Sequence, residues 1–222
     1  MLRPRKKLTR REIKEDTLVT AYVKTQKFYQ SYSKQINIFI TVLVVILAVI
    51  VIMAVSKRRA ESTAIESLGM AEHLYFSQKY PTAIEELKKI VDLYSGTKAA
   101  GRATFLLANV YFNLGNFNSA EKYFWKYINE YSDFKIFTAS SWAGIAACVE
   151  SKGKFLDAAE YYRKAALKFP DVFNAPDYLE NAGRCYEMAG DVEKAKEVYN
   201  YLIEKYPSSD IKGSVEFILK SL

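Results

Sequence analysis

The sequence predicts an all-α protein, in which a single N-terminal transmembrane helix is followed by an α-solenoid of four helix-turn-helix repeats and a C-terminal capping helix. Three observations in the 222 residues predict this fold. Residues 36–55 form an uncharged apolar run, residues 64–209 repeat with a period of 37 or 38 residues, and an amphipathic segment follows at 210–222.

Composition and charge exclude several classes of protein. The chain has two cysteines, Cys148 and Cys185, and one histidine, His73, which is too few for a disulfide scaffold or a zinc cluster. The net charge of +7 is carried by residues 1–35, where ten Lys and Arg face three Asp and Glu. From residue 60 onward, 19 basic and 22 acidic side chains give −3. Nucleic-acid binding therefore loses its main support.

The apolar run at 36–55 is long enough to cross a bilayer, because twenty helical residues span about 30 Å. A buried core helix rarely runs this far without a polar face. A cleavable signal peptide has a short charged region and an apolar region of about 7–15 residues, whereas here 35 residues precede a run of twenty. Lys57, Arg58 and Arg59 follow the run after the single residue Ser56. We therefore expect an uncleaved membrane anchor.

The orientation of this anchor is predicted from the short N-terminal tail. Close to the run, three basic residues lie on each side. Over the whole of residues 1–35, however, ten basic residues compare with three after the run, and short basic tails stay in the cytoplasm. We expect the N-terminus in the cytoplasm and the repeats on the extracytoplasmic side.

Residues 1–35 are predicted to form a basic amphipathic, interfacial helix. Thr9 to Glu12 fit a capping box at its start. Its lysines would face anionic headgroups, although a helix docked on a partner subunit explains the same pattern. The lysines are Lys14, Lys24, Lys27 and Lys34, and the apolar stripe is Leu18, Tyr22, Tyr29 and Ile36.

Four repeats in register occupy residues 64–209. A small residue allows two helices to cross closely, and an aromatic residue closes each second helix. Glycine suits the turn inside each hairpin, except in the first repeat, where Gln78 takes its place. The small residues are Ala83, Ala120, Ala158 and Ala195, facing Ala71, Ala108, Ala146 and Gly183; the closing aromatics are Tyr94, Tyr131, Phe169 and Tyr206; the turn glycines are Gly115, Gly153 and Gly190.

This pattern resembles the tetratricopeptide repeat, with a period three or four residues longer than the usual 34. The lengthening is similar to that of the envelope-associated bacterial branch of the family. Residues 210–222 are expected to cap the last repeat. Residues 56–63 are expected to form a juxtamembrane linker, where Thr63 to Glu66 offer a fresh capping box but no proline or glycine forces a break.

No residues point to catalysis, a metal or a cofactor. His73 lacks a second ligand, and no phosphate-binding loop or nucleophile motif is present. Cys148 and Cys185 occupy the same position in neighbouring repeats, and stacked helices lie about 8–10 Å apart, beyond the reach of a disulfide. Both are expected to be small buried side chains, and the protein is not expected to be an enzyme.

The resemblance implies a protein-binding groove lined by the first helix of each repeat. About half of its aromatic side chains are expected to pack between repeats instead. The groove positions carry no repeating set of Lys or Arg residues, so they do not indicate a clamp that binds an acidic C-terminus. By register the groove residues are Leu68, Glu72, Tyr75 and Phe76 in the first repeat, Arg102, Phe105, Asn109, Phe112 and Asn113 in the second, and Glu180, Arg184 and Glu187 in the fourth.

The layout is similar to that of single-span bacterial inner-membrane tetratricopeptide proteins that accompany the Sec translocon and its membrane-bound periplasmic chaperone. The resemblance implies a membrane-anchored scaffold or chaperone accessory of a protein-transport or envelope-assembly complex. Three alternatives stay open. They are an outer-membrane assembly lipoprotein, which the lack of a lipobox cysteine disfavours, a cytosol-facing mitochondrial import receptor, and a structural accessory subunit of an unrelated membrane complex.

Overall fold

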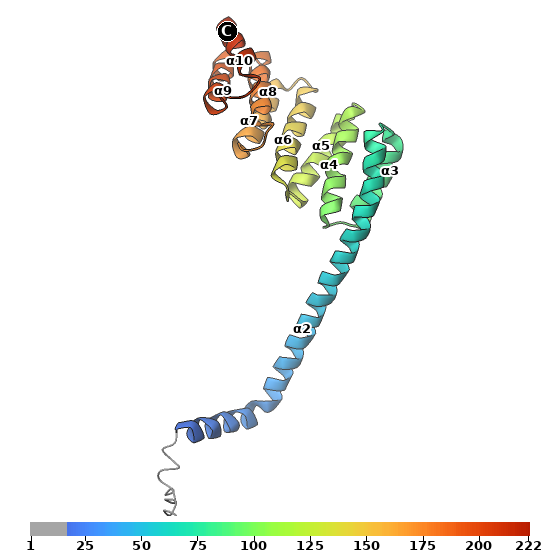
Figure 1. The fold of residues 1–222 in the computed structure, drawn as a ribbon, viewed down its shortest axis with the longest axis vertical. Coiled ribbons are helices and arrows are strands. Elements are labelled where there is room, and N and C mark those ends of the chain that lie inside the picture. The colour runs from blue at the N-terminus through green and yellow to red at the C-terminus, as the bar shows by residue number, and fades with distance from the viewer. Residues whose placement is uncertain (1–16) are drawn as a thin grey trace, which may run out of the picture. The chain divides into compact units, whose positions relative to one another are not determined.

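The computed structural model describes residues 17–222, and the predicted capping box at Thr9 to Glu12 and Lys14 lie outside them. The chain divides into two compact units, Met1–Ser56 and Lys57–Leu222. Helix α2 (Thr17–Phe76) contributes to both. Every regular element in the described residues is an α-helix, as the sequence predicts (Figure 1).

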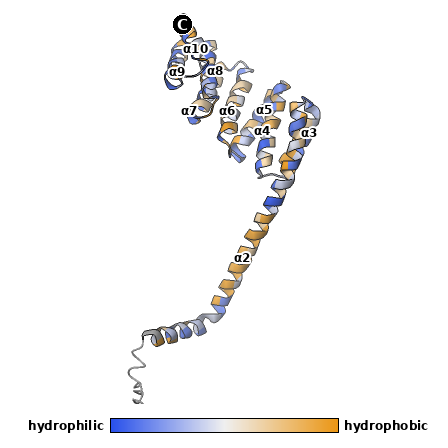
Figure 2. Cartoon of the chain, viewed as in Figure 1, coloured by the Kyte–Doolittle hydropathy of each residue, from blue (hydrophilic) through white to orange (hydrophobic). Residues whose placement is uncertain are grey.

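In the first unit, α2 carries the predicted apolar run, which Figure 2 shows as a continuous hydrophobic segment. Its side chains are exposed, from Ile38 at 57% to Met53 at 66%. By length and composition the helix can cross a membrane, a test that a signal sequence near an N-terminus also meets. The run is therefore no core helix of this chain.

Residues 56–63, the expected linker, are helical and belong to α2. The hydroxyl of Thr63 donates to the carbonyl of Arg59, one turn earlier, and does not cap a new helix. The first repeat accordingly begins inside a continuous helix.

The second unit is a stack of helical hairpins (Figure 1). The last part of α2 pairs with α3, and each later first helix pairs with the helix that follows it. After α2 come α3 (Tyr80–Leu93), α4 (Lys98–Asn113), α5 (Phe117–Glu130), α6 (Lys135–Glu150), α7 (Phe155–Lys168), α8 (Ala175–Met188), α9 (Val192–Lys205) and α10 (Lys212–Ser221).

The repeated positions have the structural roles that their residue types predict. All the small residues at the helix crossings are buried, and a Cβ added to Gly183 would overlap the ring of Tyr199. The closing aromatics are the C-cap residues of α3, α5, α7 and α9. Gly115 has φ of +71°, and Gln78, its counterpart in the first repeat, has φ of +56°.

The core forms two clusters of buried side chains. One joins the first repeat to α4, with Leu87 and Leu107 fully buried. The other runs from α4 and α5 to α10 and contains Cys148 and Cys185. Both cysteines are free thiols, as expected from their spacing. Val215 of α10 is fully buried, so this helix covers the last repeat as predicted.

Candidate functional site: a hollow on the first helices of the repeats

The first helices of repeats one to three enclose a hollow of about 540 Å³. Of the predicted groove residues, Leu68, Glu72 and Arg102 line it. The remaining lining residues are Glu61, Ile65, Gly69, Lys98, Ala99, Phe134, Ile136 and Phe137, which come from α2, α4 and the start of α6.

The carboxylate of Glu61 fixes α4 against α2 at one end of the hollow. Its oxygens accept hydrogen bonds from the backbone N–H groups of Lys98, at 2.7 Å, and Ala99, at 3.0 Å. The hydroxyl of Thr97 accepts a third from the N–H of Ala100. The first N–H groups of a helix have no partner within the helix, so these bonds define where α4 begins.

An ion pair and an aromatic stack form the wall between α2, α4 and α6. Arg102 Nε lies 2.5 Å from Glu72 Oε1, and its guanidinium carbon lies 6.0 Å from the centre of the Phe137 ring. That ring stacks on Phe105, with centroids 4.9 Å apart. The charges of the wall thus compensate each other, and Phe105 serves mainly in packing between repeats.

The surface left open in the hollow is largely apolar. Ile65 is 56% exposed and Phe134 is 45% exposed, while Leu68 is buried beneath them. Exposed apolar side chains that gather in a concavity are typical of sites that take an apolar partner segment.

The other predicted residues of repeats one and two lie outside this hollow. Tyr75 packs edge-on against Phe76 and near Tyr80, and burial raises the pKa of the Tyr75 hydroxyl. Asn113 donates to the hydroxyl of Tyr80 at 3.3 Å. Phe76 is 72% exposed.

Two further predicted residues of the second repeat are engaged locally. Phe112 packs on Phe117 with ring centres 5.4 Å apart. The side chain of Asn109 donates to the carbonyl of Phe105, within the same helix. Neither contributes to the hollow.

Two of the predicted residues of the fourth repeat, Arg184 and Glu187, are bonded to polar side chains of neighbouring helices. Arg184 pairs with Glu150 of α6 through contacts of 2.6 and 3.0 Å. The guanidinium holds the pKa of the Glu150 carboxyl below its usual range. The hydroxyl of Tyr199 donates to Glu187 at 2.5 Å, and burial raises the pKa of that hydroxyl. On this part of the face Met188 is 52% exposed, and its sulfur lies 3.6 Å from Arg184 Nη1, so the open apolar surface borders the ion pair.

Sequence reasoning missed the third repeat's share of the hollow. The segment from Phe134 to Phe137 lies one period after Thr97 to Ala100, so the register itself points to it. Glu61 also lies one period before Lys98. The hollow therefore includes residues at the start of each first helix, whereas the predicted groove residues lie further along these helices.

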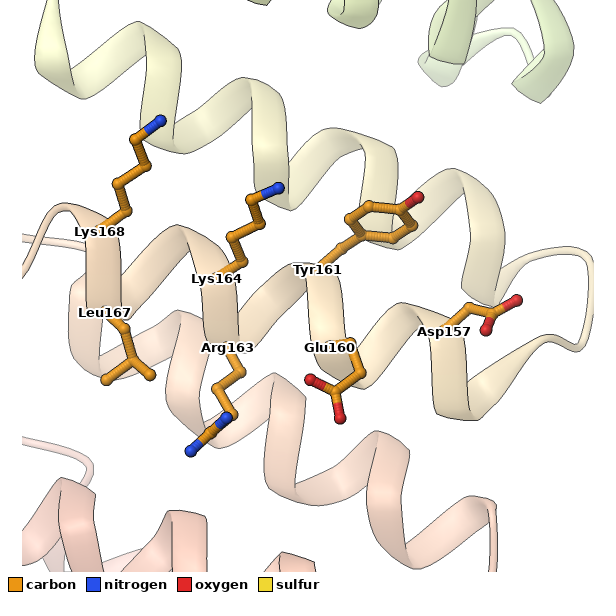
Figure 3. A pocket seen from close by; sticks show the side chains of 7 residues that line it. All are labelled: Asp157, Glu160, Tyr161, Arg163, Lys164, Leu167 and Lys168. Atoms are coloured by element: carbon orange, nitrogen blue, oxygen red, sulfur yellow. The ribbon is translucent and has the colours of Figure 1, made fainter.

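A second and wider hollow, of about 780 Å³, lies on α7 alone (Figure 3). Figure 3 shows its side chains spreading to opposite sides of one helix. Three of them are engaged: Glu160 accepts from Tyr186, Arg163 pairs with Glu197, and Lys164 lies 3.7 Å from the centre of the Trp142 ring. With no converging groups, this surface is a weaker candidate. Among residues 17–222, no group of His, Cys, Asp or Glu is placed to hold a metal.

Comparison with known proteins gives the class of the chain. Residues 68–133 and 177–209 match family models described as tetratricopeptide repeat. A TPR repeat-containing protein of Methanocaldococcus jannaschii is 24% identical over 159 residues, which cover 71% of this chain and 26% of the relative. The chain thus spans about a quarter of that relative's length. These matches identify residues 68–133 and 177–209 as tetratricopeptide repeats, in agreement with the fourfold register.

Solved structures share the fold. MamA aligns at a TM-score of 0.55 and 20% identity, over 65% of this chain and 73% of its own. A Podospora anserina kinesin light chain with nearly identical TPR-like repeats gives 0.57 at 14% identity, over 72% and 84%. YrrB, described as a TPR protein with an unusual peptide-binding site, gives 0.53 at 18% identity, over 72% and 76%.

Proposed function

We propose that this protein is a membrane-anchored scaffold or chaperone accessory of a protein-transport or envelope-assembly complex, and that the hollow binds an apolar segment of a partner. Tetratricopeptide repeats serve to bind proteins, and the solved relative YrrB is described as having a peptide-binding site.

The observation that carries this proposal is that, along the first helices, a neutralised ion pair lies beside exposed apolar side chains. In the hollow, Glu72 and Arg102 neutralise each other while Ile65 and Phe134 remain exposed. A site of this kind gains free energy by burying apolar side chains of a partner. Of the two cations that line it, Arg102 is paired with Glu72 and Lys98 remains, so it offers no pair of free cations for a terminal carboxylate. An amphipathic helix or an extended apolar peptide meets these requirements.

The proposed anchor is the apolar part of α2 at 36–55, and the helix before it would lie at the membrane interface. At about 100° per residue, the exposed aromatic residues fall on one face and the lysines on the opposite face. Phe28 and Tyr32 pack one turn apart, with ring centres 4.9 Å apart. The aromatic face is Tyr22, Phe28, Tyr29 and Tyr32, and the basic face is Lys24, Lys27 and Lys34.

The proposed location is the bacterial inner membrane, with the N-terminus in the cytoplasm and the repeats on the other side. A Ser209→Cys variant tests the orientation, because Cys148 and Cys185 are buried. A maleimide that cannot cross the inner membrane should label Cys at position 209 in intact cells. Labelling that appears only after lysis would place the repeats in the cytoplasm.

Crosslinking from the hollow tests the binding site. A photoreactive phenylalanine at Phe134, in the hollow, is compared with the same group at Phe217, which is 75% exposed on α10. We expect adducts with partner proteins from position 134, and their loss when Ile65→Asp makes the hollow polar. Mass spectrometry then identifies the partners. Adducts without translocon or envelope-chaperone components would contradict the proposed complex, and equal adducts from both positions would contradict the site.

A further inference from the structure

Five cationic side chains gather at the end of the repeat unit where the apolar segment joins it. Lys57, Arg58 and Arg59 begin this unit, and Lys98 and Lys135 are the first residues of α4 and α6. We call these five residues the cationic rim. All are exposed, and none forms an ion pair within residues 17–222.

The fold brings these residues together from three repeats. Glu61, one turn after Lys57, accepts the hydrogen bond from the N–H of Lys98. Lys98 in turn lines the hollow with Phe134, which precedes Lys135. The starts of α4 and α6 are therefore neighbours of the first turn of the unit, although the three segments are 37 residues apart in the sequence.

These positions are electrostatically unfavourable for lysine. The N-terminus of a helix carries partial positive charge, which favours an acidic residue and disfavours a cation. Helices α7, α8 and α9 follow this rule, with Asp157, Asp177 and Glu193 in their first turns. Helices α4 and α6 have no acidic residue there and begin with lysine.

Two carboxylates lie close to the rim in sequence. Glu61 accepts two backbone hydrogen bonds, and Asp133 accepts one from the hydroxyl of Tyr127 at 3.1 Å. The five cations outnumber these two carboxylates, so the rim is an exposed cluster of net positive charge in a unit whose remaining charge is mildly acidic. Such a cluster attracts an anionic surface.

We propose that the cationic rim binds the anionic lipid headgroups of the bilayer that holds the apolar segment, and so docks the repeats on the membrane surface. The inference rests on the proposed anchoring of residues 36–55. It is favoured by chain continuity, because Lys57 follows the apolar run by two residues. Cations spread over the ends of successive helices suit a surface of phosphate groups better than one carboxylate in a pocket.

The distribution of charge along the stack agrees with a contact through the first repeats. The first helices of repeats two and three begin with Lys98 and Lys135, whereas the first helix of the fourth repeat carries Asp177 in its first turn. Positive charge at this end is therefore confined to the repeats nearest in sequence to the apolar segment.

The test uses the full chain in nanodiscs of phosphatidylcholine, with or without one-third phosphatidylglycerol. A fluorophore on Ser95→Cys, an exposed turn residue before α4, reports proximity to a spin-labelled lipid headgroup. The parent chain with buried Cys148 and Cys185 gives the background. We expect quenching to rise about threefold with phosphatidylglycerol and to fall again at high salt.

Two double variants decide whether the rim is responsible. Lys98→Gln with Lys135→Gln should remove at least about half of the increase that depends on phosphatidylglycerol. The matched control, Lys196→Gln with Lys205→Gln in the fourth repeat, should leave it unchanged. Thermal unfolding of each variant shows whether the repeats remain folded.

The possible failures are distinguishable. A chain that does not elute with the nanodisc overturns the proposed anchoring. A chain that elutes with the nanodisc but is quenched equally in both lipids, or equally in rim and control variants, overturns the docking inference. Rim-dependent binding of soluble oligoglutamate, with no effect of phosphatidylglycerol, would assign the rim to an acidic protein instead.

Discussion

Arg184 of α8 and Glu150 of α6 form a bidentate ion pair across two repeats. The Nη1–Oε1 and Nη2–Oε2 distances are 2.6 and 3.0 Å, and the hydroxyl of Tyr162 donates to the same carboxylate at 3.3 Å. Because the two parallel contacts fix the orientation of both groups, this pair sets the register of one repeat on the next.

Arg184→Ala should lower the free energy of unfolding by about 1 kcal/mol at neutral pH, a value discounted because the arginine is partly exposed. The folded-state pKa of Glu150 is lowered, so its contribution is present above the unfolded pKa and is lost as the pH falls through the folded pKa. Urea unfolding of the parent chain and the variant at pH 7 and at pH 3 measures the loss of stability and its dependence on pH. Arg163→Ala, which breaks a more exposed pair at 3.4 Å, is the control and should cost less.

Gly183→Ala should destabilise the last two repeats by about 1–3 kcal/mol, because the new methyl group overlaps the ring of Tyr199 and forces α8 and α9 apart. Gly213→Ala in α10, where an added Cβ meets no atom within 4 Å, should instead be neutral or stabilising. Thermal unfolding of both variants compares them. Equal gains in stability would show that helix propensity, and not close approach, governs both sites.

Gln78→Gly should raise the free energy of unfolding by about 0.5 kcal/mol, since glycine adopts positive φ without the steric cost that Gln78 bears at +56°. The reverse change, Gly115→Gln, introduces that cost at φ of +71° in the second repeat and should be destabilising. Opposite signs in chemical denaturation are the expected result. A loss of stability in both variants would indicate that Gln78 makes a compensating interaction.

Cys148 and Cys185 should react with a thiol reagent only after unfolding. Burial raises the pKa of each thiol to about 12, so the reactive thiolate is scarce at pH 8, and both side chains are also inaccessible. Reaction kinetics in native buffer and in urea measure the difference, with Ser209→Cys as the accessible reference. Rapid reaction of the native chain would mean that the third and fourth repeats open readily.

The register of the repeats was predictable because close helix packing admits few residue types. Ala83, Ala120 and the closing aromatics occupy the places that their size requires, and Gln78 adopts the backbone conformation of the glycines it replaces. The sequence alone leaves the continuity of α2 open, because Thr63 to Glu66 fit both a capping box at the start of a new helix and the interior of an unbroken helix.

The candidate site was predictable only in part, because register places a side chain on a face but does not tell whether a neighbour covers it. Phe105 and Phe76 both belong to the predicted groove, yet Phe105 stacks on Phe137 while Phe76 is exposed away from the hollow. The role of Glu61 depends on a contact with the N-terminus of a helix one repeat later, which no local pattern records.

The division of the core into two clusters has a consequence for how the stack loses structure. Tyr111 and Tyr123 pack against both clusters and stack on each other with ring centres 5.6 Å apart. Repeat proteins break cooperatively where the coupling between neighbouring units is weakest. We therefore expect amide hydrogens of the first repeat and α4 to exchange at different rates from those of the later repeats, which native-state hydrogen exchange measures.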